Sequence, residues 1–224
     1  MTGTIAVIGG SGNLGAALAR RWVQAGQRVV IGSRDAAKAA AAAAKLAAEL
    51  GAEVGGASNM EAARQADVVV VAVPFASQLS VLEEIRPGIG GKVVIDTTVP
   101  LVPPKVARVQ LPPEGSAAQR AQKLLGADVK LVSAFHNVAA HKLATDEEVE
   151  CDVLVFGDDK AARAVAVELA TLARLRGLHA GALANAAAGE ALTSILIFMN
   201  KTYRVDGAGI RISGQLDMDA AAAA

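Results

Sequence analysis

The chain of 224 residues is 53% apolar, 20% charged and only 3% aromatic, and its 22 basic side chains balance 22 acidic ones. This length predicts one domain with an appended segment, and the missing basic block argues against nucleic acid as a partner. The single cysteine, Cys151, excludes an internal disulfide and fits a reducing cytoplasm, and no metal site is expected because no ligand cluster is present.

The two ends of the chain carry no sign of a targeting or membrane segment. An apolar strand pattern follows Met1 without a charged leader, and the longest late apolar stretch, residues 192–199, is too short to cross a bilayer. Residues 220–224 are alanines, which we expect to form a frayed tail. The sequence therefore predicts no membrane partner.

Short apolar runs alternate with helix-length segments, which is typical of repeated βα units. Four successive valines at residues 68–71 do not alternate with polar residues, as expected for a central parallel strand buried on both faces. We predict an α/β fold, with a Rossmann-type doubly wound parallel sheet over residues 1–180 and a small C-terminal helical subdomain over residues 181–224. The expected strands lie at residues 5–8, 29–31, 68–73, 93–95, 129–132 and 153–156.

Capping signals predict where the helices begin and end. Helices over residues 13–25 and 35–50 end at Gly26 and Gly51, the residue type favoured just after a helix. Ser58 and the glutamate three residues later form a capping box for a short helix.

Two later segments have their own patterns. Five prolines between residues 100 and 113 predict a long surface loop, and such loops often border a site. Residues 183–203 read as one long helix followed by a short glycine-interrupted tail.

Residues 10–15, Gly-Ser-Gly-Asn-Leu-Gly, fit the dinucleotide fingerprint and lie between the first strand and the first helix. Gly10 permits a tight turn, Gly12 lets the backbone approach a pyrophosphate, and Gly15 lets the helix pack close to the strand. The helix N-terminus supplies free N–H donors. An ordinary glycine-rich turn is the alternative, but the agreement of strand, helix and spacing favours dinucleotide binding.

The end of the second strand favours NADP over NAD. Gly32-Ser33-Arg34 stands where an NAD-binding protein usually has an acidic residue for the ribose hydroxyls. Arg34 and Ser33 can bind a 2′-phosphate, and Lys38 adds a positive charge one helical turn later. A solvated helix start is the alternative, but cations at a helix N-terminus oppose its dipole.

Two segments, residues 73–75 and 97–100, follow strands at the carboxyl edge, where open α/β sheets bind ligands. Termination of the strand by proline explains each segment equally well, so both interpretations stay open.

Residues 133–140 leave the sixth strand at this edge and contain His136, the one titrating side chain expected near the site. A hydrogen bond to a substrate carbonyl or phenolate and a structural or capping role are both open for His136. We interpret His141 and His179 as structural, and Cys151 as a core residue because it lacks a neighbouring base.

The chain resembles a known family in motifs spread over nearly its whole length. The glycine-rich turn is common to many oxidoreductases, whereas the His-Asn turn combined with the Phe-Gly-Asp-Asp strand end is much narrower. The shared stretches are residues 8–15, 32–34, 133–138, 152–159 and 209–212. On these residues the sequence resembles the NADPH-dependent reductases of the deazaflavin coenzyme F420, the coenzyme F420:NADP oxidoreductases.

This resemblance implies hydride transfer between NADP(H) and the deazaflavin, which would lie against the nicotinamide. It implies deazaflavin contacts at His136, Asn137, Asn185 and Thr193, and we expect His136, the one titrating group there, as the catalytic residue. Some relatives have a bulkier aromatic residue in place of Phe75 and a proline in place of Ala139. The expected NADP contacts come from the fingerprint, from the resemblance and from an apolar wall of the ligand crevice. They are Gly10, Ser11, Gly12, Asn13, Leu14, Gly15, Ser33, Arg34, Lys38, Val73, Phe75, Leu79, Leu101 and Ala140.

The resemblance also implies a homodimer that uses the last helix. Leu192, Ile195, Leu196 and Met199 form an apolar stripe that fits either an interface or packing against the chain's own sheet. Two other functions stay open: an NADPH-dependent flavin or imine reductase on the same scaffold, and an NADP-sensing protein without turnover. The physiological direction of the reaction does not follow from the sequence.

Overall fold

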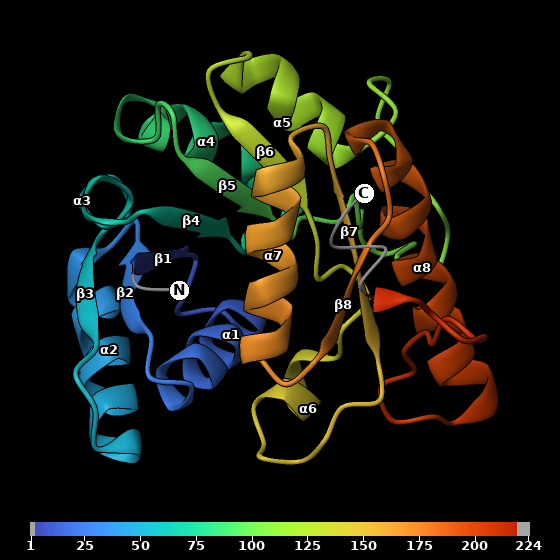
Figure 1. Cartoon of the computed structure of the whole chain (residues 1–224), viewed down its shortest axis with the longest axis horizontal. Helices are drawn as coiled ribbons and strands as arrows, with labels where there is room; N and C mark the ends of the chain where they lie inside the picture. The colour runs from blue at the N-terminus through green and yellow to red at the C-terminus, as the bar shows by residue number, and fades with distance from the viewer. Residues whose placement is uncertain (1–2, 219–224) are drawn as a thin grey trace.

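The computed structural model describes residues 3–218 and has an α/β fold in which helices cover both faces of one sheet (Figure 1). The eight strands run in the order β3-β2-β1-β4-β5-β6-β7-β8. The Rossmann-type α/β class predicted from the sequence is confirmed. Residues 220–224, for which a frayed tail was expected, lie outside the described residues.

The predicted strands all form, and two further strands accompany them. The strands are β1 (Thr4–Ile8), β2 (Arg28–Ser33), β3 (Gly55–Ser58), β4 (Val68–Val71), β5 (Val93–Asp96), β6 (Lys130–Ser133), β7 (Asp152–Gly157) and β8 (Arg176–His179). Patterning did not predict β3 and β8 because these edge strands lack an apolar run: β3 reads Gly-Gly-Ala-Ser and β8 reads Arg-Gly-Leu-His.

The helices follow the predicted caps closely. Asp35 and Ser58 cap the second and third helices through their side chains, and Gly51 ends the second helix in the left-handed conformation. The α-helices are α1 (Asn13–Gln24), α2 (Ala36–Leu50), α3 (Asn59–Gln65), α4 (Gln78–Ile85), α5 (Ala117–Leu125), α6 (Ala140–Leu143), α7 (Lys160–Leu172) and α8 (Ala186–Tyr203). Short 3₁₀ turns are η1 (Phe75–Ser77), η2 (Arg86–Gly88) and η3 (Leu183–Asn185).

Two apolar cores lie on the two faces of the sheet. One packs Leu18 and Trp22 of α1 with Leu169 of α7, and the other packs Leu82 of α4 with Leu125 of α5. Strand residues alternate between the cores, so the central valines are buried on both faces as the sequence predicted. Because β1, β2, β4 and β5 pair in parallel, their carboxyl ends share one edge of the sheet.

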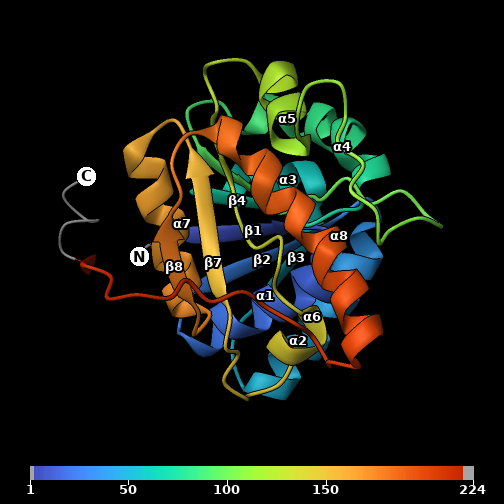
Figure 2. The ribbon, with the colours of Figure 1, turned by 90° about the vertical axis from the view of Figure 1, so that its right-hand side faces the viewer.

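The sheet is not wholly parallel, which corrects the sequence prediction. β7 pairs antiparallel with β6, Ser133 lying opposite Phe156, and β8 then runs parallel to β7. The connection between β6 and β7 contains the four-residue helix α6, which is shorter than the helices that usually join parallel strands, and the chain returns in the reverse direction. β7 and β8 therefore end at the edge opposite the carboxyl ends of β1, β2, β4 and β5. Helix α8 starts there and runs back along the β6–β7 side (Figure 2).

The segment after α8 is tied to β7 through a buried carboxylate. Asp152 is fully buried, pairs with Arg176 at 2.6 Å, and accepts a hydrogen bond from the Ile212 N–H at 2.6 Å. The Asp152 N–H in turn donates to the Ile210 carbonyl at 2.8 Å. These contacts give two of the stretches shared with the family, residues 152–159 and 209–212, a structural role. The predicted subdomain boundary at residue 181 stays a prediction.

The last helix is apolar and only partly covered. Residues Leu183–Tyr203 are long and apolar enough, by length and composition alone, to cross a membrane, with a mean hydropathy of 1.2 and a third of the segment buried. Of the predicted stripe, Leu196 is buried and Leu192 half-buried, whereas Ile195 and Met199 are exposed. The stripe thus serves the chain's own core in part and leaves an apolar face outside.

Candidate active site

The turn between β1 and α1 leaves space for a ligand at the carboxyl edge. Gly12 is the N-cap of α1 and offers no side-chain acceptor to the first N–H groups of the helix. A Cβ atom on Gly12 would meet only the Gly9 carbonyl oxygen at 3.2 Å, whereas one on Gly15 would lie 2.6 Å from that oxygen. The geometry fits the roles predicted for both glycines: room for a pyrophosphate at Gly12, and close packing of the helix at Gly15.

The turn depends on one more glycine than the fingerprint named. Gly9 has a φ of +81°, and a Cβ atom there would collide with the backbone of Ala72. Gly10, to which the tight turn was assigned, lacks a positive φ, but its Cβ would lie 2.8 Å from the Val7 carbonyl oxygen. Gly9 is needed for its conformation and Gly10 for space.

Ser33 and Arg34 lie beside this turn at the end of β2. Arg34 and Lys38 are exposed to solvent and Ser33 is half-buried. A carboxylate does follow, but Asp35 uses it to cap α2, accepting hydrogen bonds from the N–H groups of Ala37 at 3.0 Å and Lys38 at 3.2 Å. Asp35 is therefore engaged and does not replace the missing ribose-binding acid. Its charge also offsets part of the conflict between the two cations and the helix dipole.

A cavity of about 180 Å³ opens where these elements meet. Its lining combines the glycine-rich turn, the end of β2 and the segment after β4. Of the predicted NADP contacts, this cavity brings together Ser11, Gly12, Ser33, Arg34 and Val73. Asn59, which the sequence did not single out, belongs to the same wall.

A second cavity, of about 590 Å³, lies on the other side of the turn between α1, α2 and α6. It contains Ala140, another predicted NADP contact, together with Ser11 and Asn13. His141, interpreted as structural, also lines it and pairs with Asp206 at 2.8 Å, which links α6 to the segment after α8.

Six predicted NADP contacts line neither cavity: Lys38 is exposed on α2, Leu14 and Gly15 are half-buried and buried on α1, and three lie further along the chain. Phe75, Leu79 and Leu101 are half-buried on η1, α4 and the loop after β5. The guanidinium of Arg120 lies over the Phe75 ring, 4.4 Å from its centre. Their contacts with NADP stay predictions.

His136 follows a strained position at the end of β6. Phe135 has a φ of +64°, an outlier for an aromatic residue, and it packs edge-to-face on Trp22 with ring centres 6.1 Å apart. The His136 ring is 5% exposed, its Nε2 lies 2.7 Å from the Ser133 hydroxyl, and its Nδ1 is buried without a partner among the described residues. Burial lowers the pKa of His136 to about 4. The ring is therefore neutral at physiological pH.

The four side chains predicted to meet the deazaflavin do not all lie together. The Thr193 hydroxyl donates to the His136 carbonyl at 2.8 Å, so these two residues are neighbours. Asn137 is buried, and its amide donates to the Asp152 carbonyl and to the Cys151 sulfur. Asn185 is exposed eight residues before Thr193, about 12 Å along the helix, and donates to the Ala180 carbonyl. This separation follows from the reversed direction of β7.

Close approach of α8 to His136 requires a glycine. A Cβ atom on Gly189 would lie 2.5 Å from the Phe156 ring and 3.4 Å from His136 Nδ1. The histidine and phenylalanine rings are themselves in contact, with centres 6.1 Å apart. The His136 ring is thus enclosed by β6, β7 and α8.

Two buried carboxyl groups near this edge were not found from the sequence. Asp96 ends β5, and its carboxylate accepts hydrogen bonds from the Gln78 amide and the Thr98 N–H. Glu190 of α8 accepts from the first N–H groups of α5, those of Ala117 at 2.6 Å and Ala118 at 3.0 Å. Burial raises the pKa of Asp96, and it raises that of Glu190 to about 7 against the opposing effect of its hydrogen bonds.

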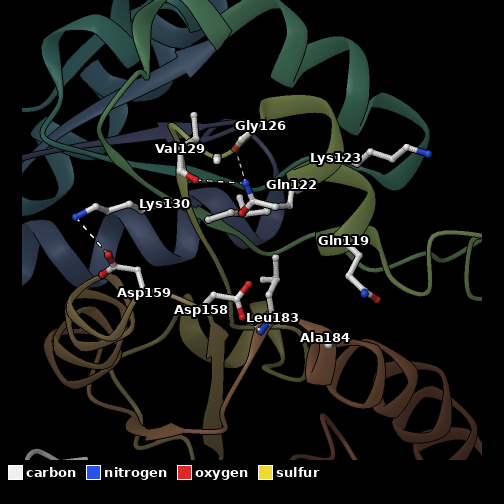
Figure 3. A pocket seen from close by; sticks show the side chains of 12 residues that line it. Gln119, Gln122, Lys123, Gly126, Val129, Lys130, Asp158, Asp159, Leu183 and Ala184 are labelled. Carbon is white, nitrogen blue, oxygen red and sulfur yellow. Dashed lines mark hydrogen bonds and ion pairs between the residues drawn. The ribbon is translucent and has the colours of Figure 1, made fainter.

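A larger cavity, of about 740 Å³, is not part of this site (Figure 3). It lies near the start of β6 and the end of the antiparallel β7, at the opposite edge from the glycine-rich turn. Several of its polar groups make contacts within the fold: Gln122 donates to the Gly126 carbonyl, Asp158 accepts from the Leu183 N–H, and Lys130 pairs with Asp159.

Comparison with known proteins identifies the family. The chain is 43% identical to the F420-dependent NADP reductase of Methanothermobacter thermautotrophicus, over 93% of this chain and 94% of that protein. It is 36% identical to the protein of the same name from Methanocaldococcus jannaschii, over 93% and 97%. The family description "NADP oxidoreductase coenzyme F420-dependent" matches residues 4–100. The chain belongs to the coenzyme F420-dependent NADP oxidoreductases.

Solved structures support the fold of this F420-dependent oxidoreductase family. A crystal structure from Arthrobacter sp. FB24, provisionally assigned as an F420-dependent NADP reductase, has a TM-score of 0.79 and 24% identity, covering 95% of this chain and all of that one. An imine reductase from Bacillus cereus has a TM-score of 0.65 and 18% identity, covering 90% of this chain and 62% of that one. At these identities both comparisons bear on the fold alone.

In this member of the family, sequence reasoning found the buried His136 and Asn137 but missed the two buried carboxyl groups. Asp96 could have been noticed, since a carboxylate directly after a run of buried apolar residues at the carboxyl edge is unusual. Glu190 had no such signal, because its partners are 72 and 73 positions away in the chain.

Proposed function

We propose that this protein transfers a hydride between NADP(H) and the deazaflavin coenzyme F420. The observation that carries the proposal is the 36–43% identity to F420-dependent NADP reductases over 93% of the chain. A glycine-rich turn with room above Gly12 and a strand end with Ser33 and Arg34 supports the same assignment.

In this proposal the N-terminal part of the sheet holds the nucleotide. Gly12 and the first N–H groups of α1 bind the pyrophosphate, and Ser33, Arg34 and Lys38 bind the 2′-phosphate. When bound, the nicotinamide and the deazaflavin would supply the chemistry, hydride exchange in either direction, so the protein has to hold two rings with the reacting carbons about 3–3.5 Å apart and exclude water. Val73, Phe75, Val138 and Leu196 with the loop around Pro103 would form the apolar wall.

The role of His136 in this proposal is orientation. A ring whose pKa is lowered to about 4 is neutral at neutral pH, so it keeps one N–H for a hydrogen bond but has no imidazolium proton to give as a general acid. Its neighbours, Ser133 and Thr193, fix its ring and its backbone respectively. His136 would therefore shape the deazaflavin side of the site as a neutral group, while the hydride passes directly between the two bound rings.

The direct test is the loss of absorbance at the deazaflavin band when NADPH is added. Turnover with the deazaflavin but not with riboflavin phosphates is expected. NADPH oxidation with flavins or imines alone would replace this proposal by the other reductase functions, and binding without any turnover would make the protein an NADP sensor.

An isotopic experiment tests the hydride route. NADPH deuterated on the transferred face should leave its deuterium at C5 of the reduced deazaflavin in ordinary water. Substantial exchange with solvent during turnover would rule out direct transfer.

We further propose that two copies of the chain associate through α8, in the cytoplasm. Ile195, Phe198, Met199 and Tyr203 are 38–68% exposed on this helix, and a grouped exposed apolar surface is typical of protein–protein contact sites. A buried free thiol at Cys151 suits a reducing compartment. Light scattering should give twice the mass of the 22.6 kDa chain, and Phe198→Glu should give the monomer mass. A wild-type monomer would contradict the dimer.

A further inference from the structure

The wall of the 180 Å³ cavity contains a buried amide with an unused acceptor. Asn59 is 2% exposed, and its Oδ1 has no hydrogen-bond partner among the described residues. An unmade hydrogen bond at a buried polar atom destabilises the fold, so native proteins seldom leave one without a reason. An absent ligand is one such reason.

The orientation of this amide follows from its other hydrogen bond. Asn59 Nδ2 donates to a carboxylate oxygen of Glu84, on α4, at 3.1 Å. Because a carboxylate can only accept, the nitrogen must face Glu84 and the oxygen must face the other way. Glu84 therefore fixes Oδ1 as an acceptor directed away from α4.

Oδ1 lies next to the end of β2. A Cβ atom built on Gly32 would be 3.4 Å from it, and Gly32 directly precedes Ser33 and Arg34. In the paired register, Ser33 lies opposite Ser58, the residue before Asn59. The acceptor therefore belongs to the part of the cavity where Arg34 would bind the 2′-phosphate of the adenosine ribose.

We propose that Asn59 is a further nucleotide-binding residue, whose Oδ1 accepts a hydrogen bond from the 3′-hydroxyl of the adenosine ribose of NADP. With the 2′-oxygen phosphorylated and the 5′-oxygen in the pyrophosphate, the 3′-hydroxyl is the one donor left on that ribose. An acceptor here also suits a hydroxyl beside a phosphate held by Arg34. This inference rests on the proposed binding of NADP and extends it to a residue outside the fingerprint.

The test is a double-mutant cycle between protein and ligand, read by calorimetric binding without turnover. Wild type should bind NADPH about tenfold more tightly than an NADPH analogue lacking the adenosine 3′-hydroxyl. Asn59→Ala should bind NADPH about tenfold more weakly than wild type and should no longer distinguish the analogue. Gln65→Ala, an exposed change in the same helix, serves as the control and should behave as wild type.

Two outcomes would overturn the inference. If wild type binds NADPH and the analogue with the same affinity, the protein makes no such contact. If Asn59→Ala still binds the analogue tenfold more weakly than NADPH, the 3′-hydroxyl is recognised by another residue. If Asn59→Ala does not fold, Glu84→Leu is the deciding variant, because it removes the carboxylate that orients Asn59. The preference for NADPH over the analogue should then weaken several-fold. An unchanged preference would contradict the proposal. Failure of F420 reduction by protein that binds NADPH would refute the proposed function and leave this contact standing.

Discussion

The two sides of the candidate site are built in different ways. On the nucleotide side, Gly9 and Gly12 lie in the turn after β1, and Ser33 and Arg34 lie at the end of the adjacent parallel strand β2, where backbone groups and polar side chains form the surface. On the side of β5, β6 and α8, the polar residues Asp96, His136 and Glu190 are buried, and each also contacts a residue of another element: Gln78, Phe156 and Ala117 respectively. Binding and folding should therefore separate on the first side and be coupled on the second.

The largest expected effect is on the nucleotide side. Gly12→Val should abolish NADPH binding, because the side chain would fill the space left for the pyrophosphate, while the protein stays folded. Calorimetry and circular dichroism on one sample measure both properties. Gly90→Val is the matched control, since that glycine also lacks a positive φ and faces open space. Micromolar binding by the Gly12 variant would mean that the turn is only structural.

On the opposite side, His136→Ala should slow turnover about ten- to a thousandfold, within the range of lost orientation and electrostatic stabilisation, without abolishing it. We also expect a lower melting temperature for this variant, because the ring is enclosed by Phe156 and α8. Ser133→Ala keeps the ring and removes only its hydrogen bond, so a smaller loss is expected. Unchanged turnover per folded molecule in His136→Ala would assign the ring to packing alone.

Arg34→Ala should weaken NADPH binding about ten- to a hundredfold and leave NADH binding nearly unchanged, because a charge-assisted hydrogen bond contributes about 1.5–3 kcal/mol. The side chain is exposed, so the melting temperature should not move. Arg86→Ala, another exposed arginine, is the control. Equal losses for NADPH and NADH would contradict the 2′-phosphate assignment.

The smallest net effect concerns pH and stability. The pKa of Glu190 rises from 4.5 to about 7 on folding, so its proton stabilises the fold below pH 4.5, and this contribution is lost as the pH rises to about 7. The pKa of His136 falls from 6.5 to about 4, so its contribution is present above pH 6.5 and lost as the pH falls to about 4. Each amounts to about 3 kcal/mol, and the two largely cancel in wild type.

Removing either group should reveal the pH dependence of stability that the other group contributes. Relative to wild type, Glu190→Gln should gain stability as the pH rises from 4.5 to 7, and His136→Gln should lose stability from pH 4 to 6.5. Urea unfolding at several pH values measures both differences. Variants with the same pH dependence as wild type would show that neither group titrates as its burial implies.

The same contrast explains what could be predicted from the sequence. The fingerprint turn, the cap at Ser58 and the exposed cations of Arg34 and Lys38 are set by neighbouring residues, so local rules locate them. The direction of β7, the displacement of Asn185 from His136 and the contact of Glu190 with α5 depend on packing between distant segments. Asn59 falls between these cases: its helix was predicted, but its unpaired oxygen appears only when β2 and α4 are placed around it.

The packing of Trp22 gives this protein a built-in optical probe. The chain has a single tryptophan, which is fully buried, donates its indole N–H to the Leu169 carbonyl and touches Phe135, the strained residue before His136. Its fluorescence therefore comes from one place, on the inner side of the His136 turn. Emission at the short wavelengths of an apolar environment should report the folded state without a label, and energy transfer to the reduced nicotinamide should quench it when NADPH binds.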